Sequence, residues 1–303
     1  MKTSIIVLLL AGITLAAPAS AAAHGRSQTI ALDYRLVLDR ATRSLHGVSV
    51  AILDGDRSVR VSTHGVTVVV RGDLGEPMLR IGPSGVWVNR ASVTAVANRL
   101  TSLSHDWKRV ASGHSYAWHE HRLAPPPYGS KVGPVARFAM PATIDGHAVT
   151  IGGTFVRYRR PAVWPWLVGA AVFAAAIWAA TRHGWRVTVV LGALAGVATL
   201  ASRVSFSAAA ALNGRVAWPQ IGLWLALGGV GCFGLIRTRG QDRVLVAGLL
   251  GCVTAVLSLG SLGVFWHGVV LSEFSATFTR VLIAVALIAG AAAAATLPGG
   301  FRK

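Results

Sequence analysis

The chain has 303 residues, of which 53% are hydrophobic and 13% charged, and its mean hydropathy is +0.56. A soluble chain typically carries about a quarter of charged residues, so this composition excludes an ordinary soluble protein and predicts that much of the chain faces lipid. The net charge of +18, from 29 Lys+Arg against 11 Asp+Glu, would suit nucleic acid, but a largely membrane-embedded chain removes nucleic acid from the expected partners.

The N-terminus has the pattern of a secretory signal peptide. Lys2 supplies a positive charge, and the apolar stretch 5–17 is shorter than the roughly 20 residues that a membrane span needs. Small residues at 21–23 match a signal-peptidase cleavage site. We therefore expect residues 1–23 to be a signal peptide whose removal leaves His24 as the new N-terminus. Cleavage one or two residues earlier and a retained signal anchor are the alternatives.

Residues 24–160 are expected to form an extracytoplasmic domain. They hold no Cys and are polar enough to fold in water. Short β-like runs are separated by Gly and Pro, and Asp145-Gly146 between two such runs is a hairpin signal. The runs are 59–70, 78–88, 115–123, 135–140 and 148–158, with a weak helical pattern over 91–103. This pattern predicts an all-β sandwich with an immunoglobulin-like fold.

Residues 161–303 are expected to form an all-α membrane domain with five transmembrane helices. The apolar segments are 164–180, 187–201, 218–236, 244–265 and 281–297, and we expect Arg203 to limit the second. Basic residues gather in 182–186, 237–243 and 302–303. Because basic loops stay in the cytoplasm, they predict a multi-pass protein of the bacterial plasma membrane, with the N-terminal domain outside and the C-terminus in the cytoplasm.

Histidines carry the clearest chemical signal, since eight of the ten lie within 24–160. On a strand over 115–123, His119 and His121 would share one face, which suits a single metal ion. A free N-terminal His24 would chelate through its α-amine and imidazole, and copper heads the affinity series for nitrogen ligands. The sequence therefore predicts Cu(II) as the ligand. Two solvated imidazoles on a surface strand are the alternative for His119 and His121.

The stretch 144–149 reads I-D-G-H-A-V and is followed by Gly152. This pattern resembles the C-terminal motif of the periplasmic copper-resistance C family. The resemblance implies a small β-sandwich or barrel whose Cu(II) site is made by His24, Asp145 and His147, beside a membrane partner thought to import copper. A plain hairpin turn is the alternative for the Asp-Gly-His segment.

The whole chain resembles uncharacterised membrane proteins of high-GC bacteria that combine an exported domain with several helices. The likeness rests on the Ala-His-Gly start at 23–25, on the E-P-M-L-R stretch at 76–80 and on the W-H-E-H-R segment at 118–122. This resemblance implies an architecture and no particular activity.

Three functions are compatible with these patterns. The leading prediction is a membrane-anchored metal-handling protein that binds Cu(II) for storage or for transfer to its membrane domain; the expected ligands are His24, His119, His121, Asp145 and His147. The alternative is a non-enzymatic basic module, since residues 24–160 hold 18 Lys+Arg against 9 Asp+Glu, an excess that suits anionic envelope polymers or lipid headgroups. An enzyme is not expected, because no catalytic motif occurs; a copper-brace oxidase is the third candidate.

The expected partners are a metal ion, membrane lipid, and anionic envelope polymers or another membrane protein.

Overall fold

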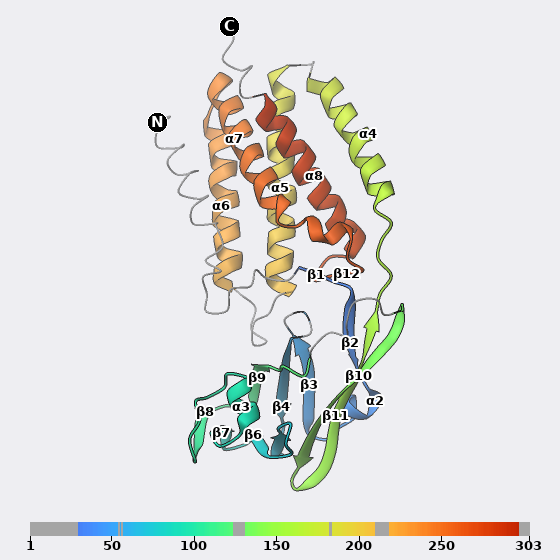
Figure 1. The fold of residues 1–303 in the computed structure, drawn as a ribbon. Helices are drawn as coiled ribbons and strands as arrows, with labels where there is room; N and C mark the ends of the chain where they lie inside the picture. Colours follow the sequence, from blue (N-terminus) through green and yellow to red (C-terminus); the bar gives the residue numbers. More distant parts are fainter. Residues whose placement is uncertain are drawn as a thin grey trace. The chain divides into compact units, whose positions relative to one another are not determined.

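The computed structural model describes residues 30–53, 55, 57–123, 131–181, 184–209 and 218–296. Within them the chain divides into two compact units, a β unit (Leu32–Arg159) and a helix unit, which holds 30–31 and the residues from 160 onward (Figure 1). The predicted order, a sheet-rich region followed by a helical region, is confirmed. The predicted signal peptide, 1–23, and His24 lie outside the described residues.

The β unit is built from two antiparallel sheets. The larger sheet has the strand order β2 (Tyr34–Leu38), β11 (His147–Arg157), β10 (Gly133–Ile144), β5 (Val68–Arg71), β6 (Pro77–Gly82), β7 (Gly85–Asn89) and β8 (Trp107–Ala111). The smaller sheet has the order β3 (Val48–Leu53), β4 (Ser58–Thr63) and β9 (Ser115–His119). Two short helices, α2 (Arg40–Arg43) and α3 (Val93–Ala97), lie in the connections.

One hydrophobic core holds the β unit together, and both sheets contribute to it. Every second residue of β4 and β5 is fully buried, as strand alternation requires when one face packs inward; these residues are Val59, Val61, Val68 and Val70. Trp118 of β9 joins the same core. The two sheets therefore enclose a shared apolar interior. The finer, immunoglobulin-like assignment stays a prediction.

Two predicted strands differ from the observed ones. The run predicted over 59–70 is broken at 64–67, where Gly65 has a φ of 76°, so β4 and β5 belong to different sheets. The strand predicted over 115–123 ends at His119, and residues 121–122 form a turn. The turn forms because the Glu120 carboxylate accepts hydrogen bonds from the backbone and the side chain of Arg122.

The hairpin predicted at Asp145-Gly146 joins β10 to β11. Both turn residues have positive φ values, 47° at Asp145 and 87° at Gly146, as a two-residue type I′ turn requires. Asp145 also ties the turn to the residue before β5, since its Oδ1 accepts a hydrogen bond from the backbone N–H of Thr67 at 2.9 Å. The carboxylate therefore has a structural partner in the fold.

The helix unit contains α4 (Trp164–Thr181), α5 (Trp185–Ala209), α6 (Trp218–Arg237), α7 (Gly240–Leu259), the 3-10 helix η2 (Leu262–Phe265) and α8 (Ala276–Ala295). The chain passes from the helix unit to the β unit within the short strand β1 (Ala31–Leu32), which pairs with β12 (Val269–Val270) of the helix unit. The helices α5, α6, α7 and α8 are each long and apolar enough to cross a bilayer, so the chain is a multi-pass membrane protein. The apolar stretch of α4, Trp164–Ala179, is shorter, and the fifth span stays a prediction.

The ends of two helices differ from the predicted ones. Helix α5 does not stop before Arg203 but continues to Ala209. The Arg203 guanidinium donates to the Leu257 carbonyl and lies over the Trp224 ring, so its charge does not force the helix to end. Helix α7 ends at Leu259, and the last four residues of the predicted fourth span form η2.

Glycines bring α7 and α8 into close contact. A β-carbon at Gly251 would lie 2.6 Å from the carbonyl oxygen of Gly290, and one at Gly290 would lie 2.7 Å from the carbonyl oxygen of Gly251. Neither position has room for a larger residue, as is typical of membrane helices that pack through small residues.

Replacing Gly251 by Ala is expected to destabilise the helix unit by about 2 kcal/mol, because the added methyl group must push two backbones apart. Thermal unfolding of the full chain in detergent, followed by circular dichroism of the helices, measures the effect. Gly222→Ala in α6 is the matched control, since no atom lies within 4 Å of the β-carbon it would add. Equal melting temperatures for the two variants would contradict this packing.

Candidate functional site

The two histidines of the predicted metal pair have different surroundings. His119 is the last residue of β9, and the strand ends before His121, so alternation along a strand does not place the two rings on one face. Instead, the His121 ring lies between Asp73 Oδ2, 2.7 Å from its Nε2, and Asn98 Oδ1, 2.6 Å from its Nδ1. Both ring nitrogens of His121 are therefore occupied by contacts within the β unit.

Asp145 and His147 lie at the exposed end of the β10–β11 hairpin. Within the described residues, no three side chains of His, Cys, Asp or Glu lie together as a metal site would need. The Cu(II) site expected from His24, His119, His121, Asp145 and His147 thus stays a prediction, and its N-terminal ligand lies outside the part of the chain that the structure describes.

A second pair of histidines comes together in the fold without a sequence signal. The rings of His64 and His114 have centroids 5.9 Å apart, and both residues are exposed. They are far apart in the sequence, and the antiparallel pairing of β4 with β9 makes them neighbours. Two imidazoles leave most positions around a metal ion unfilled, so this pair alone does not make a metal site.

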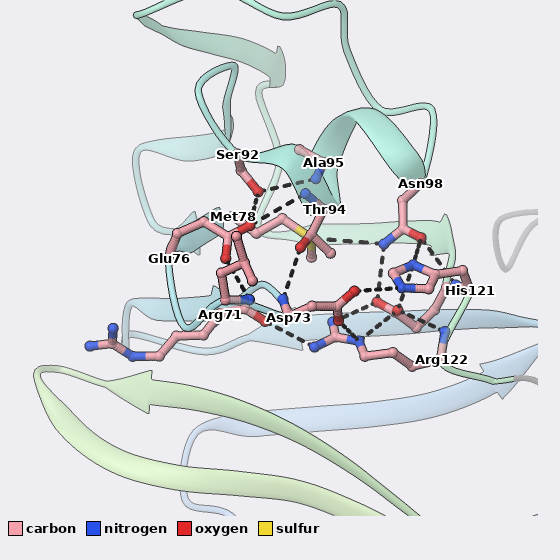
Figure 2. Close-up of polar contacts among 12 residues, drawn as sticks. Arg71, Asp73, Glu76, Met78, Ser92, Thr94, Ala95, Asn98, His121 and Arg122 are labelled. Carbon is pink, nitrogen blue, oxygen red and sulfur yellow. Dashed lines mark hydrogen bonds and ion pairs between the residues drawn. The ribbon is translucent and has the colours of Figure 1, made fainter.

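Glu120 is a fully buried carboxylate at the centre of a polar network. Figure 2 shows the surrounding residues of this network, among them Asp73, Asn98, His121 and Arg122. Arg122 donates from Nε to Oε1 at 2.8 Å and from Nη2 to Oε2 at 2.9 Å, and Trp118 Nε1 donates to Oε2 at 2.9 Å. Burial by itself raises the pKa of Glu120, but the pairing with Arg122 and the hydrogen bond from Trp118 outweigh it and lower the pKa. The carboxylate is thus held ionised.

Arg122 connects this carboxylate to the loop between β5 and β6. Its Nη1 donates to the Arg71 carbonyl at 3.1 Å, and its Nε lies 3.5 Å from Asp73 Oδ1. Asn98 completes the network, since its Nδ2 donates to Glu120 Oε2 at 3.3 Å. A carboxylate surrounded by this many donors has no lone pair directed at a substrate, so the network acts structurally, by fixing three loops to one another.

Glu76 fastens the start of α3 to the same loop. Its Oε1 accepts hydrogen bonds from the Ser92 hydroxyl at 2.6 Å and from the Thr94 N–H at 3.3 Å. Burial raises the pKa of Glu76, but these hydrogen bonds outweigh it and lower the pKa from 4.5 to about 2. Glu76 is therefore ionised, and stabilising, at all pH values near neutrality.

A cationic and aromatic patch lies on the face of β6, β7 and β8 that points away from the core. The register pairs Arg80 with Trp87, and Trp87 with Arg109, across the three strands. The Arg80 guanidinium lies 5.5 Å from the ring centroid of Trp87 and 5.3 Å from that of Trp107. The Arg109 guanidinium lies 6.0 Å from the Trp87 centroid. We call Arg80, Trp87, Trp107 and Arg109 the arginine–tryptophan patch.

The charges of this patch are not neutralised by acidic side chains. Arg80 and Arg109 are exposed, and no ion pair joins either of them to a carboxylate of the described residues. An indole face attracts a guanidinium group but accepts none of its in-plane hydrogen bonds. The Nε1 of Trp87 is buried and also has no partner among the described residues. The patch thus offers fixed positive charge and the in-plane N–H donors of two guanidinium groups that lie over indole rings.

Sequence alternation contains part of this signal. In 79–81 and 86–88 the apolar residues are buried at alternate positions, and this pattern turns Arg80 and Trp87 outward. Strand β8 reads W-K-R-V-A and has no such alternation. It is not among the predicted strands, so Trp107 and Arg109 carry no sequence signal of their own.

No protein-family model matches the chain, and comparison with curated proteins and with solved structures finds no match. A proposal for the function therefore depends on the described residues themselves.

Replacing Glu120 by Gln is expected to destabilise the β unit by about 3 kcal/mol, because it leaves the largely buried Arg122 guanidinium without its counter-charge. Denaturant unfolding of the full chain in detergent, with hydrogen exchange of the β4 and β9 peptides, measures the loss. Asp106→Asn is the control: it breaks the exposed ion pair with Arg90, and such pairs contribute little. A Glu120 variant as stable as the control would contradict a structural role for the network.

The β unit is expected to lose stability as the pH falls from about 4.5 towards 2, the interval between the ordinary and the lowered pKa of Glu76. A lowered pKa in the folded state stabilises the fold above that interval, and protonation removes the effect within it. Melting temperatures across this pH range measure the slope. Glu76→Gln should be less stable at neutral pH and flatter below pH 4.5; a slope equal to that of the wild type would contradict the assignment.

Proposed function

We propose that the β unit binds an anionic polymer of the cell envelope through the arginine–tryptophan patch, while the helix unit anchors it in the membrane. The observation that carries the proposal is the Arg80–Trp87–Arg109 row across three paired strands. Its two guanidinium groups lie over indole rings and have no carboxylate partner among the described residues.

The spacing of the row favours an extended ligand. Neighbouring strands lie about 4.8 Å apart, so the backbones of Arg80 and Arg109 are separated by roughly 10 Å with an aromatic ring between them. Guanidinium groups bind carboxylates, phosphates and sulfates through two parallel hydrogen bonds. Trp87 lies between the two guanidinium groups and holds them apart. An extended polymer that carries several anionic groups can contact both guanidinium groups at once, and it therefore matches the patch better than a single small anion does.

The charge of the surrounding domain supports the same ligand class. Residues 24–160 carry twice as many basic as acidic residues, and such an excess raises the local concentration of polyanions near the surface. The placement of this domain outside the membrane, expected from the basic loops, would expose it to envelope polymers. Copper handling remains a prediction that depends on His24, and the polymer proposal takes precedence because its residues are together in the fold.

The double variant Arg80→Ala/Arg109→Ala is expected to bind a polyanion roughly tenfold more weakly than the wild type, because two charge-assisted contacts are lost. The full chain in phosphatidylcholine nanodiscs is titrated with sulfated dextran, and neutral dextran serves as the uncharged probe. Arg40→Ala/Arg43→Ala, two exposed arginines of α2, is the control with the same change in net charge.

Three outcomes would overturn the proposal. Equal weakening in the control variant would mean that net charge, and not the patch, attracts the polymer. Binding to phosphatidylglycerol nanodiscs without binding to sulfated dextran would identify a lipid headgroup as the ligand. Loss of binding after chelation of metals would favour the copper prediction instead.

A further inference from the structure

Arg203 is the centre of a group of donors in the helix unit that the proposed function does not use. It lies on α5, and its guanidinium donates to the carbonyl of Leu257 in the last turn of α7. The same guanidinium lies 5.5 Å from the ring centroid of Trp224 on α6. Three helices thus meet at one positive charge.

Each of the three helices also carries a buried polar atom with no hydrogen-bond partner within the described residues: Thr199 Oγ1 on α5, Trp224 Nε1 on α6 and Ser258 Oγ on α7, with Ser261 Oγ as a fourth just after α7. Thr199, Trp224 and Ser258 are only 5%, 9% and 1% exposed. Thr199 lies one helical turn before Arg203 and so on the same side of α5, and Ser258 directly follows Leu257. Native proteins leave few buried polar atoms unpaired, and Trp224, whose ring lies beneath the Arg203 guanidinium, has one of them.

Arg280 on α8 is a useful comparison, because its guanidinium donates hydrogen bonds to two backbone carbonyls of the same unit. Its Nε donates to the Val264 carbonyl at 2.8 Å, and its Nη2 donates to the His267 carbonyl at 3.1 Å. The hydroxyls of Ser272 and Thr279 pair with each other at 2.9 Å. A guanidinium group has five N–H donors, and the described hydrogen bonds of Arg203 go to the Leu257 carbonyl alone.

The donors define the chemistry of the ligand. A cation is excluded by the charge of Arg203, with which no carboxylate of the described residues pairs. The guanidinium fork and the indole N–H only donate, and a hydroxyl can also donate, so a ligand with negative charge and several acceptor oxygens matches them. A phosphate group meets both conditions and binds arginine through two parallel hydrogen bonds.

We propose that Arg203, Trp224, Thr199 and Ser258 form a binding site for a phosphate group, supplied by a lipid headgroup or by free phosphate. The depth along the helices suits either source. Arg203 lies six residues before the end of α5, and Trp224 lies six residues after the start of α6, which is about 9 Å from each end. A long arginine side chain at this depth reaches the headgroup level of a bilayer.

The full chain, purified in detergent without lipid, is titrated with inorganic phosphate by calorimetry. In parallel, native mass spectrometry compares the retention of phosphatidylglycerol with that of diacylglycerol, which lacks the phosphate. Binding of inorganic phosphate is expected if the source is free phosphate, and preferential retention of phosphatidylglycerol if the source is a lipid. Arg203→Gln is expected to weaken the observed binding about tenfold, since the variant loses the charge-assisted contacts.

Trp224→Phe keeps the aromatic ring and removes only the N–H, and Thr199→Val keeps the shape and removes the hydroxyl. Each is expected to weaken binding several-fold, and these two variants decide the question if Arg203→Gln does not fold. Arg186→Gln is the matched control, because Arg186 lies 5.8 Å from the Trp185 ring at the opposite end of α5. The proposal is overturned if neither probe binds, if the control weakens binding as much as Arg203→Gln, or if Trp224→Phe and Thr199→Val bind like the wild type.

Discussion

An excess of positive over negative charge is the constraint on which the rest of this structure depends. The chain has 29 Lys+Arg for 11 Asp+Glu, so most guanidinium groups must be stabilised by something other than a carboxylate. Three arginines among the described residues illustrate different arrangements, one of them with a carboxylate. Arg122 shares a buried carboxylate with the surrounding donors, Arg80 lies over two indole rings, and Arg280 donates to backbone carbonyls where a helical turn ends. Each arrangement influences the path of the backbone near its arginine.

The arrangements also decide which arginines remain able to bind a ligand. The pair formed by Arg122 and Glu120 uses both carboxylate oxygens, so it stiffens the β unit and offers nothing outside it. An aromatic ring stabilises the charge of Arg80 but accepts none of its in-plane hydrogen bonds, and these donors stay available at the rim. Arg203 combines one backbone carbonyl with one indole ring and so keeps part of its donor set.

The sequence predicts the architecture better than the sites because architecture follows from repeating patterns. Apolar stretches identify the membrane helices, and Asp145-Gly146 identifies a hairpin because few residues adopt two successive positive φ values. The end of β9 could not be predicted, since it depends on the carboxylate of Glu120 meeting Arg122 inside the core. Arg203 illustrates the same difficulty: its effect on α5 depends on partners in α6 and α7, which sequence periodicity does not contain.

Solvent distinguishes the two sites that pair arginine with tryptophan. The patch at Arg80 is exposed to water, where salt screens charges beyond about 8 Å under physiological conditions, so a single contact there is weak and a polymer gains by making several. The guanidinium of Arg203 is half-buried among apolar helices, where the lower dielectric strengthens each interaction with an anion. One pair of residue types therefore suits a repeated, salt-sensitive ligand in the β unit and a single phosphate group in the helix unit. The two sites contain the same residue types and differ in their exposure to water. Residue composition alone therefore does not identify either of the proposed ligands.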